Sequence, residues 1–294
     1  MCRSLFIPVT ILTFLASVYG QQQPTVKLGV LDFGTSSQGR LVAETIRKEL
    51  RSIGTVQLVD RDLSAAAARG VGYSGSLNMS VSDAKDLGTA IDSEFFIIGD
   101  AQTLRRSSST HPVYYESYSS ALVISSRTGR LVLWDRLTAE GETAKEAEEN
   151  FNKTFSASNP INRYLDVIRK SRLEEMKERF TAADQSAPLI EDAPDDEKIA
   201  ATQGLRLPKP YRRLRPTYPE SAAKADAEGT VDVLVDVGAD GEVQQIQVAR
   251  WAGFGLDETT VATVRQLHFF PAMRNGTPVP LRVLLRYNFR KPSQ

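Results

Sequence analysis

The stretch "VDVLVDVGADGEVQQIQV", Val231–Val248, decides how the C-terminal part of this 294-residue chain folds. Valine occupies every second position from 231 to 237, which is the period-two pattern of a strand with one face in a core. The glycine-containing "GADG" then turns the chain, and the next residues return as a second strand. The stretch therefore predicts a hairpin, with Asp232 and Asp236 on the solvent-facing side of its first strand.

A calcium-binding loop of the EF-hand type is the alternative interpretation of the same acidic residues. With Asp236 first, such a loop has Asp240 fifth and Gly241 sixth, as its geometry requires. However, Gly238 stands third and Gln247 last, and a neutral amide cannot supply the bidentate carboxylate that closes the site. The hairpin is the better prediction.

The residues that follow complete a small β-β-α-β unit. Val243 lies on the opposite parity from Ile246 and Val248, so the returning strand needs a bulge. A helix is expected to start near Asp257. The final strand, Leu281–Phe289, alternates apolar and polar residues and so presents one face to a core.

Composition argues against several classes of function. The chain has 36 basic and 36 acidic side chains, so no global field favours nucleic acid or an anionic membrane. Its only two histidines, His111 and His268, fall in different segments, and His268 is expected in a core wall. No nucleophile, phosphate-binding or dinucleotide-binding motif occurs. We therefore expect no enzyme activity, no catalytic residue, no metal and no cofactor.

Residues 1–20 have the order of a secretory signal peptide. Arg3 precedes an apolar run from Leu5 to Val18, and small residues then suit cleavage before Gln21. An uncleaved inner-membrane anchor is the alternative, although the run is shorter than the roughly 20 residues of a spanning helix. The only cysteine, Cys2, precedes the apolar run, so a lipoprotein signal is not expected.

Residues 24–156 predict an α/β domain with a mixed sheet. "TVKLGVLDFG", "TVQLVDRD" and "EFFIIGDA" are typical of strands, and helical patterns separate them. A long antiparallel hairpin is expected to turn at Gly129 and to close the sheet.

A surface helix over residues 160–183 and a linker over 184–215 are expected to follow. The linker is first acidic and then basic, and it contains several prolines. Its basic part is either a solvated, extended lead-in to the next module or a patch that docks an anionic partner. The basic residues are Arg206, Lys209, Arg212, Arg213 and Arg215. The predicted fold class is thus α+β, with a sandwich-like N-terminal domain, a helical linker and a small C-terminal module.

Residues 216–290 resemble the TonB C-terminal domain family. The resemblance rests on motifs in the family's order, such as "EGTV" entering the first strand, "DG" at the hairpin, "FPA" and "NG". The matching residues include Tyr218, Pro219, Gly229, Gly241, Pro271 and Gly276. The fold implied is the β-β-α-β unit described above.

The resemblance implies binding of protein by strand pairing. In this family the module pairs a strand with a short N-terminal box of an outer-membrane receptor, which is β-augmentation of a sheet edge. The strand carried over consists of Leu281, Arg282, Val283, Leu284, Leu285, Arg286, Tyr287, Asn288 and Phe289. Alternatively, its arginines only discourage aggregation of the edge. If the edge binds, proline at Val283 or Leu285 is expected to abolish binding.

Two departures from the family bear on energy coupling. Residues 1–20 contain no histidine, and no long run of proline repeats follows them. The N-terminal domain, through "VKLGVLDFG" and "AKDLGTAIDSEFFIIGDA", more faintly resembles periplasmic α/β domains of the CsgG and LpoB type, which are accessory domains rather than enzymes.

These observations predict a periplasmic adaptor that binds an envelope protein or an outer-membrane receptor segment. An anchored energy transducer for outer-membrane transport is one alternative, and it requires residues 1–20 to remain in the membrane. The other is a structural envelope protein that binds peptidoglycan or forms a homodimer.

Overall fold

The computed structural model of this chain describes residues 25–107, 113–184, 190–194 and 196–291. The expected signal peptide, residues 1–20, and His111 lie outside these ranges. Among the described helices, none combines the length and the apolar character needed to cross a lipid bilayer.

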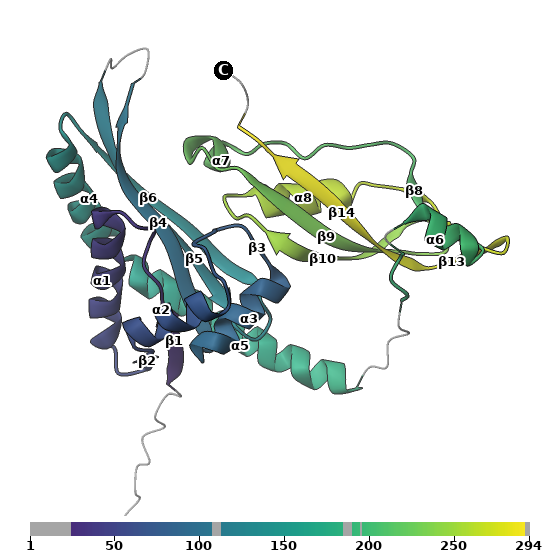
Figure 1. The fold of residues 1–294 in the computed structure, drawn as a ribbon, viewed down its shortest axis with the longest axis horizontal. Helices are drawn as coiled ribbons and strands as arrows, with labels where there is room; N and C mark the ends of the chain where they lie inside the picture. The colour runs from purple at the N-terminus through teal and green to yellow at the C-terminus, as the bar shows by residue number, and fades with distance from the viewer. Residues whose placement is uncertain (1–24, 108–112, 185–189, 195, 292–294) are drawn as a thin grey trace, which may run out of the picture.

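The N-terminal part is built on a five-stranded mixed sheet with the order β2-β1-β4-β5-β6 (Figure 1). β1 pairs in parallel with β2 and β4, whereas β5 pairs antiparallel with β4 and β6. The turn between β5 and β6 places Gly129 at φ 68°, which confirms the expected closing hairpin. The strands are β1 Val26–Val30, β2 Val56–Leu58, β4 Phe95–Arg106, β5 Tyr114–Ser125 and β6 Leu131–Gly141.

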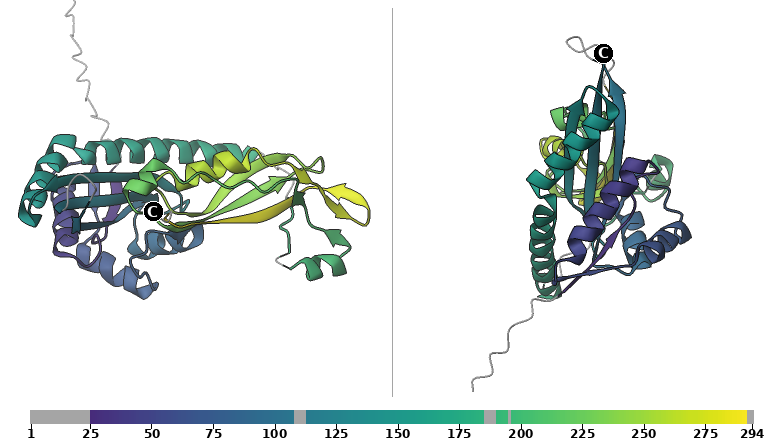
Figure 2. Two further views of the ribbon diagram at one scale, coloured as in Figure 1. Left: turned by 90° about the horizontal axis from the view of Figure 1, so that it is seen from above. Right: turned by 90° about the vertical axis from the view of Figure 1, so that its left-hand side faces the viewer.

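Helices cover both faces of this sheet, so the sandwich-like α/β architecture expected from the sequence is confirmed. Side chains of α1, α4 and α5 share one core with one face of the sheet, and those of α2 and α3 share a core with the other. Figure 2 (left) shows α5 on the side of the sheet opposite to α2 and α3. The helices are α1 Ser37–Arg51, α2 Arg61–Gly70, α3 Val81–Ile91, α4 Ala144–Ser158 and α5 Pro160–Asp184.

Two of these helices differ from the sequence expectation. Helix α2 was not expected, because its apolar residues are mostly alanines and give a weak hydrophobic period; Asp60 nevertheless caps it by accepting from two backbone N–H groups. Helix α5 is a surface helix only in its second half. Its first half buries Ile161, Tyr164 and Ile168 in the core.

The C-terminal module has the expected β-β-α-β order. Its sheet runs β14-β9-β10, and α8 packs on the face that carries the valines from Val231 to Val237, all four of which are fully buried. The expected bulge in the returning strand is confirmed by a register shift between Val243 and Gln245. The elements are β9 Gly229–Val237, β10 Val243–Trp251, α8 Leu256–Val264 and β14 Leu281–Phe289.

Part of the segment expected to be a linker packs against this module. Leu205 and Ala200 are buried against Ala272 and Leu281, which explains why these residues are ordered on the module. Strand β7 pairs with β12, and β8 pairs with β11. The short elements are α6 Glu197–Thr202, β7 Leu205–Arg206, β8 Lys209–Pro210, α7 Glu220–Lys224, β11 Phe269–Phe270, β12 Ala272–Arg274 and β13 Thr277–Val279.

A two-residue strand of the N-terminal part, β3 (Met79–Ser80), joins the C-terminal sheet next to β10. Asn78 fixes this contact. Its side-chain amide donates to the carbonyl oxygens of Thr230 and Trp251, at 2.8 and 2.7 Å, and its oxygen accepts from the Thr230 N–H at 3.1 Å. The two parts of the chain are therefore connected through a shared sheet.

Candidate protein-binding edge

Strand β14 lies at one edge of the C-terminal sheet. The hydrogen bonds of Arg282 show which of its N–H and C=O groups point away from the sheet. The Arg282 N–H donates to the Glu191 carbonyl at 2.8 Å, and the Ala193 N–H donates to the Arg282 carbonyl at 2.7 Å. Arg282 therefore directs its peptide groups away from β9. Because this direction alternates along an antiparallel strand, the same holds for Leu284, Arg286 and Asn288.

The odd-numbered residues of β14 consequently direct their peptide groups to β9. The sequence expectation that proline at Val283 or Leu285 removes a donor from the partner is wrong, because those N–H groups face the neighbouring strand of the module. Proline at Leu284 is the substitution that removes an outward donor.

The arginines of β14 are held inside the module. Arg282 donates to both oxygens of Asp236 at 2.6 and 2.9 Å, and Arg286 donates to both oxygens of Asp232 at 2.7 and 2.9 Å. The register places each arginine directly opposite its aspartate. The hydrogen bonds to Asp236 raise the pKa of Arg282.

The prediction that Asp232 and Asp236 face solvent is therefore wrong. They are 5% and 3% exposed, because the guanidinium groups of the opposite strand cover them. A period-two pattern identifies which residues share a face but does not show what covers that face. The calcium-loop alternative fails for Asp236 on the same ground, since an arginine already engages both of its oxygens.

Charge is thus neutralised along the edge strand, and an apolar side chain is exposed between the two arginines. Leu284 is 50% exposed and lies on the same face as Arg282 and Arg286. On the other face, Val283 and Leu285 pack against the core of the module. The accessible part of the edge therefore consists of outward peptide groups next to one exposed leucine.

The start of this edge is already occupied. The segment Glu191–Ala193 forms a parallel bridge with β14 at Arg282. The Glu191 carboxylate also binds Arg274, with both oxygens within 2.9 Å of one guanidinium nitrogen. A partner strand can pair freely only from Leu284 onward.

The six family-motif residues support the module rather than line this edge. The Tyr218 hydroxyl donates to the Ala227 carbonyl at 2.7 Å and so holds the loop before β9. The others lie before α7, in β9, in turns and between β11 and β12; they are Pro219, Gly229, Gly241, Gly276 and Pro271.

Gly241 is a position where only glycine fits. Its φ is 84°, and a Cβ atom there would lie 2.0 Å from the carbonyl oxygen of Phe269. Gly276 takes φ 87° in the turn between β12 and β13. These motif glycines are explained by turn geometry.

His268 does not form a core wall as expected. Its side chain is exposed and its Nδ1 lies 2.9 Å from Glu242, at a bridge between the two segments. In the described part of the chain, no three histidine, cysteine or acidic side chains come together in a way that could hold a metal ion.

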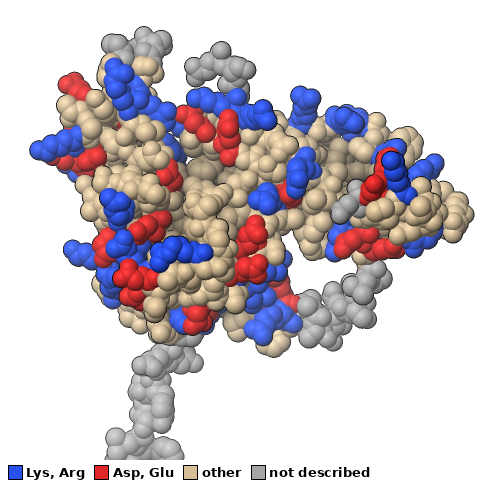
Figure 3. All heavy atoms as spheres, in the orientation of Figure 1, with Lys and Arg blue, Asp and Glu red and all other residues tan. Residues whose placement is uncertain are grey.

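Charged side chains of both signs are interspersed over the face drawn in Figure 3. Among the basic side chains of the tract from Arg206 to Arg215, that of Lys209 forms an ion pair with Glu197 at 3.5 Å.

The C-terminal part of the chain is similar in sequence to known proteins. Residues 215–290 match the family model described as the Gram-negative bacterial TonB protein C-terminal. Protein TonB of Klebsiella pneumoniae is 29% identical over 108 residues, which are 37% of this chain and 43% of that protein. Protein TonB of Klebsiella aerogenes is 35% identical over 81 residues, 28% of this chain and 33% of that protein. The chain thus spans less than half the length of these relatives.

Among solved structures, the TonB C-terminal domain of Pseudomonas aeruginosa is 26% identical, with a TM-score of 0.26, over 30% of this chain and 89% of that one. Escherichia coli LpoB is 15% identical, with a TM-score of 0.29, over 40% of this chain and 59% of that one. By the family-model match and the two sequence relatives, residues 215–290 are similar to the TonB C-terminal domain.

Proposed function

We propose that this protein is a periplasmic adaptor that binds an extended segment of an envelope protein or outer-membrane receptor along β14. The observation that carries the proposal is the outward direction of the peptide groups of Leu284, Arg286 and Asn288 beyond the end of the linker contact. A partner strand completes a hydrogen-bond ladder there, as in other β-augmentation complexes. No catalytic step is part of this role.

The side chains of the edge suggest which partner segments fit. Leu284 offers an apolar contact, while the pairing of Arg282 and Arg286 with aspartates leaves little net charge to attract an anionic peptide. We expect partner segments with an apolar residue opposite Leu284 and with no requirement for acidic residues.

The test compares two substitutions at one position. Leu284→Pro removes an outward N–H from an edge strand, where proline is tolerated, whereas Leu284→Ala removes the side chain and keeps the N–H. Binding of a synthetic peptide that copies the N-terminal box of an outer-membrane receptor is measured by isothermal titration calorimetry. We expect at least tenfold weaker binding for Leu284→Pro and a smaller loss for Leu284→Ala. A folded Leu284→Pro protein that binds as tightly as the wild type contradicts the proposal.

The proposed location has a separate test. Cleavage before Gln21 releases a protein into soluble periplasmic extract, whereas an anchored energy transducer stays in the membrane fraction. N-terminal sequencing of the protein from each fraction distinguishes the two; a mature protein that still carries residues 1–20 in membranes contradicts the adaptor role.

A further inference from the structure

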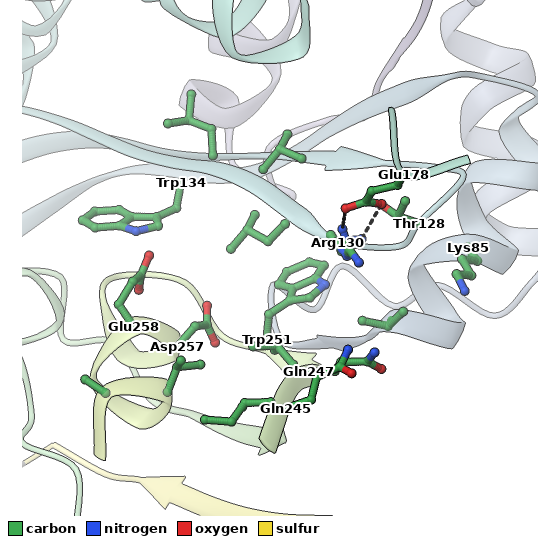
Figure 4. A pocket seen from close by; sticks show the side chains of 18 of the residues that line it. Lys85, Thr128, Arg130, Trp134, Glu178, Gln245, Gln247, Trp251, Asp257 and Glu258 are labelled. Atoms are coloured by element: carbon green, nitrogen blue, oxygen red, sulfur yellow. Dashed lines mark hydrogen bonds and ion pairs between the residues drawn. The ribbon is translucent and has the colours of Figure 1, made fainter. Parts of the chain in front are cut away.

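A cavity of about 820 Å³ lies between the N-terminal part and the C-terminal module (Figure 4). Strand β6, strand β10, α8 and the start of α3 contribute its walls. Its apolar lining includes Leu131, Trp134, Ile246, Val248, Trp251 and Val261. The volume falls in the range of sites that enclose a ligand or a short peptide.

The cavity faces the edges of two sheets. Four consecutive residues of β6, 131–134, and four consecutive residues of β10, 245–248, line it. Successive side chains of a strand point to opposite faces, so a cavity that touches every residue of a run lies beside the strand's edge. β6 is the last strand of its sheet, and β10 has only the two-residue β3 beyond it.

The outward groups of β10 follow from the pairing of the module. The odd residues of β9 bond to β14, so its even residues bond to β10, where they lie opposite Gln245 and Gln247. The peptide groups of Ile246 and Val248 therefore point away from β9 and toward the cavity.

This open stretch is short because both of its ends are closed. At one end Glu242 forms a bridge with His268, and at the other β3 pairs antiparallel with Arg250 and Trp251. Between these closures, β10 has no second strand partner among the described residues. A strand of about six residues, roughly 20 Å long, fills such a gap.

Three exposed charged side chains that line the cavity, those of Lys85, Glu258 and Arg265, form no ion pair with any residue that the structure describes. Lys85 and Glu258 lie on opposite sides of the cavity in Figure 4. Another cation of the lining, Arg130, is bound to Glu178 at 2.7 Å. Because two of the three side chains without an ion pair are cations, an occupant with an acidic side chain complements this arrangement.

We propose that this cleft is a second protein-binding site, which takes an extended peptide of a partner protein as a strand added to β10 beyond β3. The peptide hydrogen-bonds to Ile246 and Val248, places apolar side chains over Trp251 and Trp134, and directs an acidic side chain to Lys85. β3 already pairs with this edge in antiparallel fashion, and the peptide continues the same ladder. The site is independent of β14.

The chain provides its own probe of this cleft, because its only two tryptophans, Trp134 and Trp251, both line it. The full mature chain is titrated with the capped hexapeptide Glu-Val-Thr-Val-Thr-Lys and with the capped reverse order, while tryptophan emission is recorded. We expect a saturable change with at least one of the two orders. Leu284→Pro should leave this titration unchanged, which separates this site from β14.

The decisive control alters the peptide and leaves the protein intact. Two N-methylated peptides are compared, one methylated at the odd positions and one at the even positions. Only one of the two patterns removes the N–H donors that face β10, and the peptide with that pattern should bind at least tenfold more weakly. Lys85→Glu should weaken binding of the unmodified peptide about threefold, an effect typical of one exposed ion pair. No saturable change with either order, or equal binding of every N-methylated form, overturns the proposal.

Discussion

The two edges of the C-terminal sheet are partly covered by different parts of the chain. At β14 the linker segment Glu191–Ala193 covers Arg282, and among the described residues no other segment pairs with the outer side of this strand. At β10 the N-terminal part supplies β3, and the remaining edge faces a cleft between the two parts. Each edge thus keeps only a short open stretch, and short edge strands discourage aggregation. The following substitutions distinguish the interactions that stabilise each edge from those that would bind a partner strand.

The largest expected effect concerns the arginines of β14. Arg282→Ala leaves the carboxylate of Asp236 buried without its partner and should lower the free energy of unfolding by about 3 kcal/mol. Arg286→Ala is the matched control and should cost less, since Asp232 keeps Arg250 at 3.6 Å. Urea denaturation of both variants checks this order. Equal, small losses would show that both arginines act only as exposed edge charges.

The next effect concerns the β10 edge and its connection to the N-terminal part. Asn78→Ala removes three hydrogen bonds to Thr230 and Trp251 and should cost about 2 kcal/mol. We also expect the wild type to unfold in one transition and the two parts of this variant to unfold separately. Ser74→Ala, in the exposed loop before Asn78, is the control. Calorimetry showing an unchanged single transition would contradict the role assigned to Asn78.

A smaller effect is expected from the linker at β14. Replacing Glu191-Asp192-Ala193 by Gly-Ser-Gly removes the Glu191 contact with Arg274 and weakens the bridge to Arg282. Binding of a receptor-box peptide long enough to reach Arg282 should then tighten about fivefold, because the peptide no longer competes with the linker. A peptide that stops at Leu284 should not distinguish the two proteins. Equal affinity for the long peptide would show that the linker does not restrict the edge.

The smallest effect is a pH dependence at the end of β10. Asp257 accepts from the N–H groups of Ala252 and Gly253 at 2.8 Å, yet burial raises its pKa to about 7. A folded-state pKa above the unfolded value means that the stabilising contribution is complete in acid and is lost as pH rises through about 7. Wild type should therefore lose stability relative to Asp257→Asn as pH rises from about 4 to about 7. A difference that does not change with pH would contradict this.

Much of the C-terminal module could be predicted from its sequence. The alternating valines of β9, the parity change after Val243 and the turn residue Gly241 each reflect a local requirement of a strand, a bulge or a turn. Such requirements involve neighbours along the chain, so the pattern alone reveals them.

The candidate edge could be predicted only in part. Sequence identified β14, but its outward parity depends on a hydrogen bond from Arg282 to Glu191, 91 positions earlier in the chain. The cover on Asp236 likewise comes from a distant strand. Nothing in the sequence "NMS" at Asn78 indicates a strand that joins another part of the molecule. These features arise from pairing between distant segments, which no local period encodes.

Residue-resolved amide hydrogen exchange, in the free protein and with bound receptor-box peptide, shows which amides of β14 pair with a partner strand. We expect the amides of Leu284, Arg286 and Asn288 to exchange rapidly in the free protein and to become protected on binding. The amides of Val283, Leu285 and Tyr287 should be protected in both states, because they face β9. New protection confined to the odd-numbered residues, or none at all along β14 with peptide bound, would contradict the account.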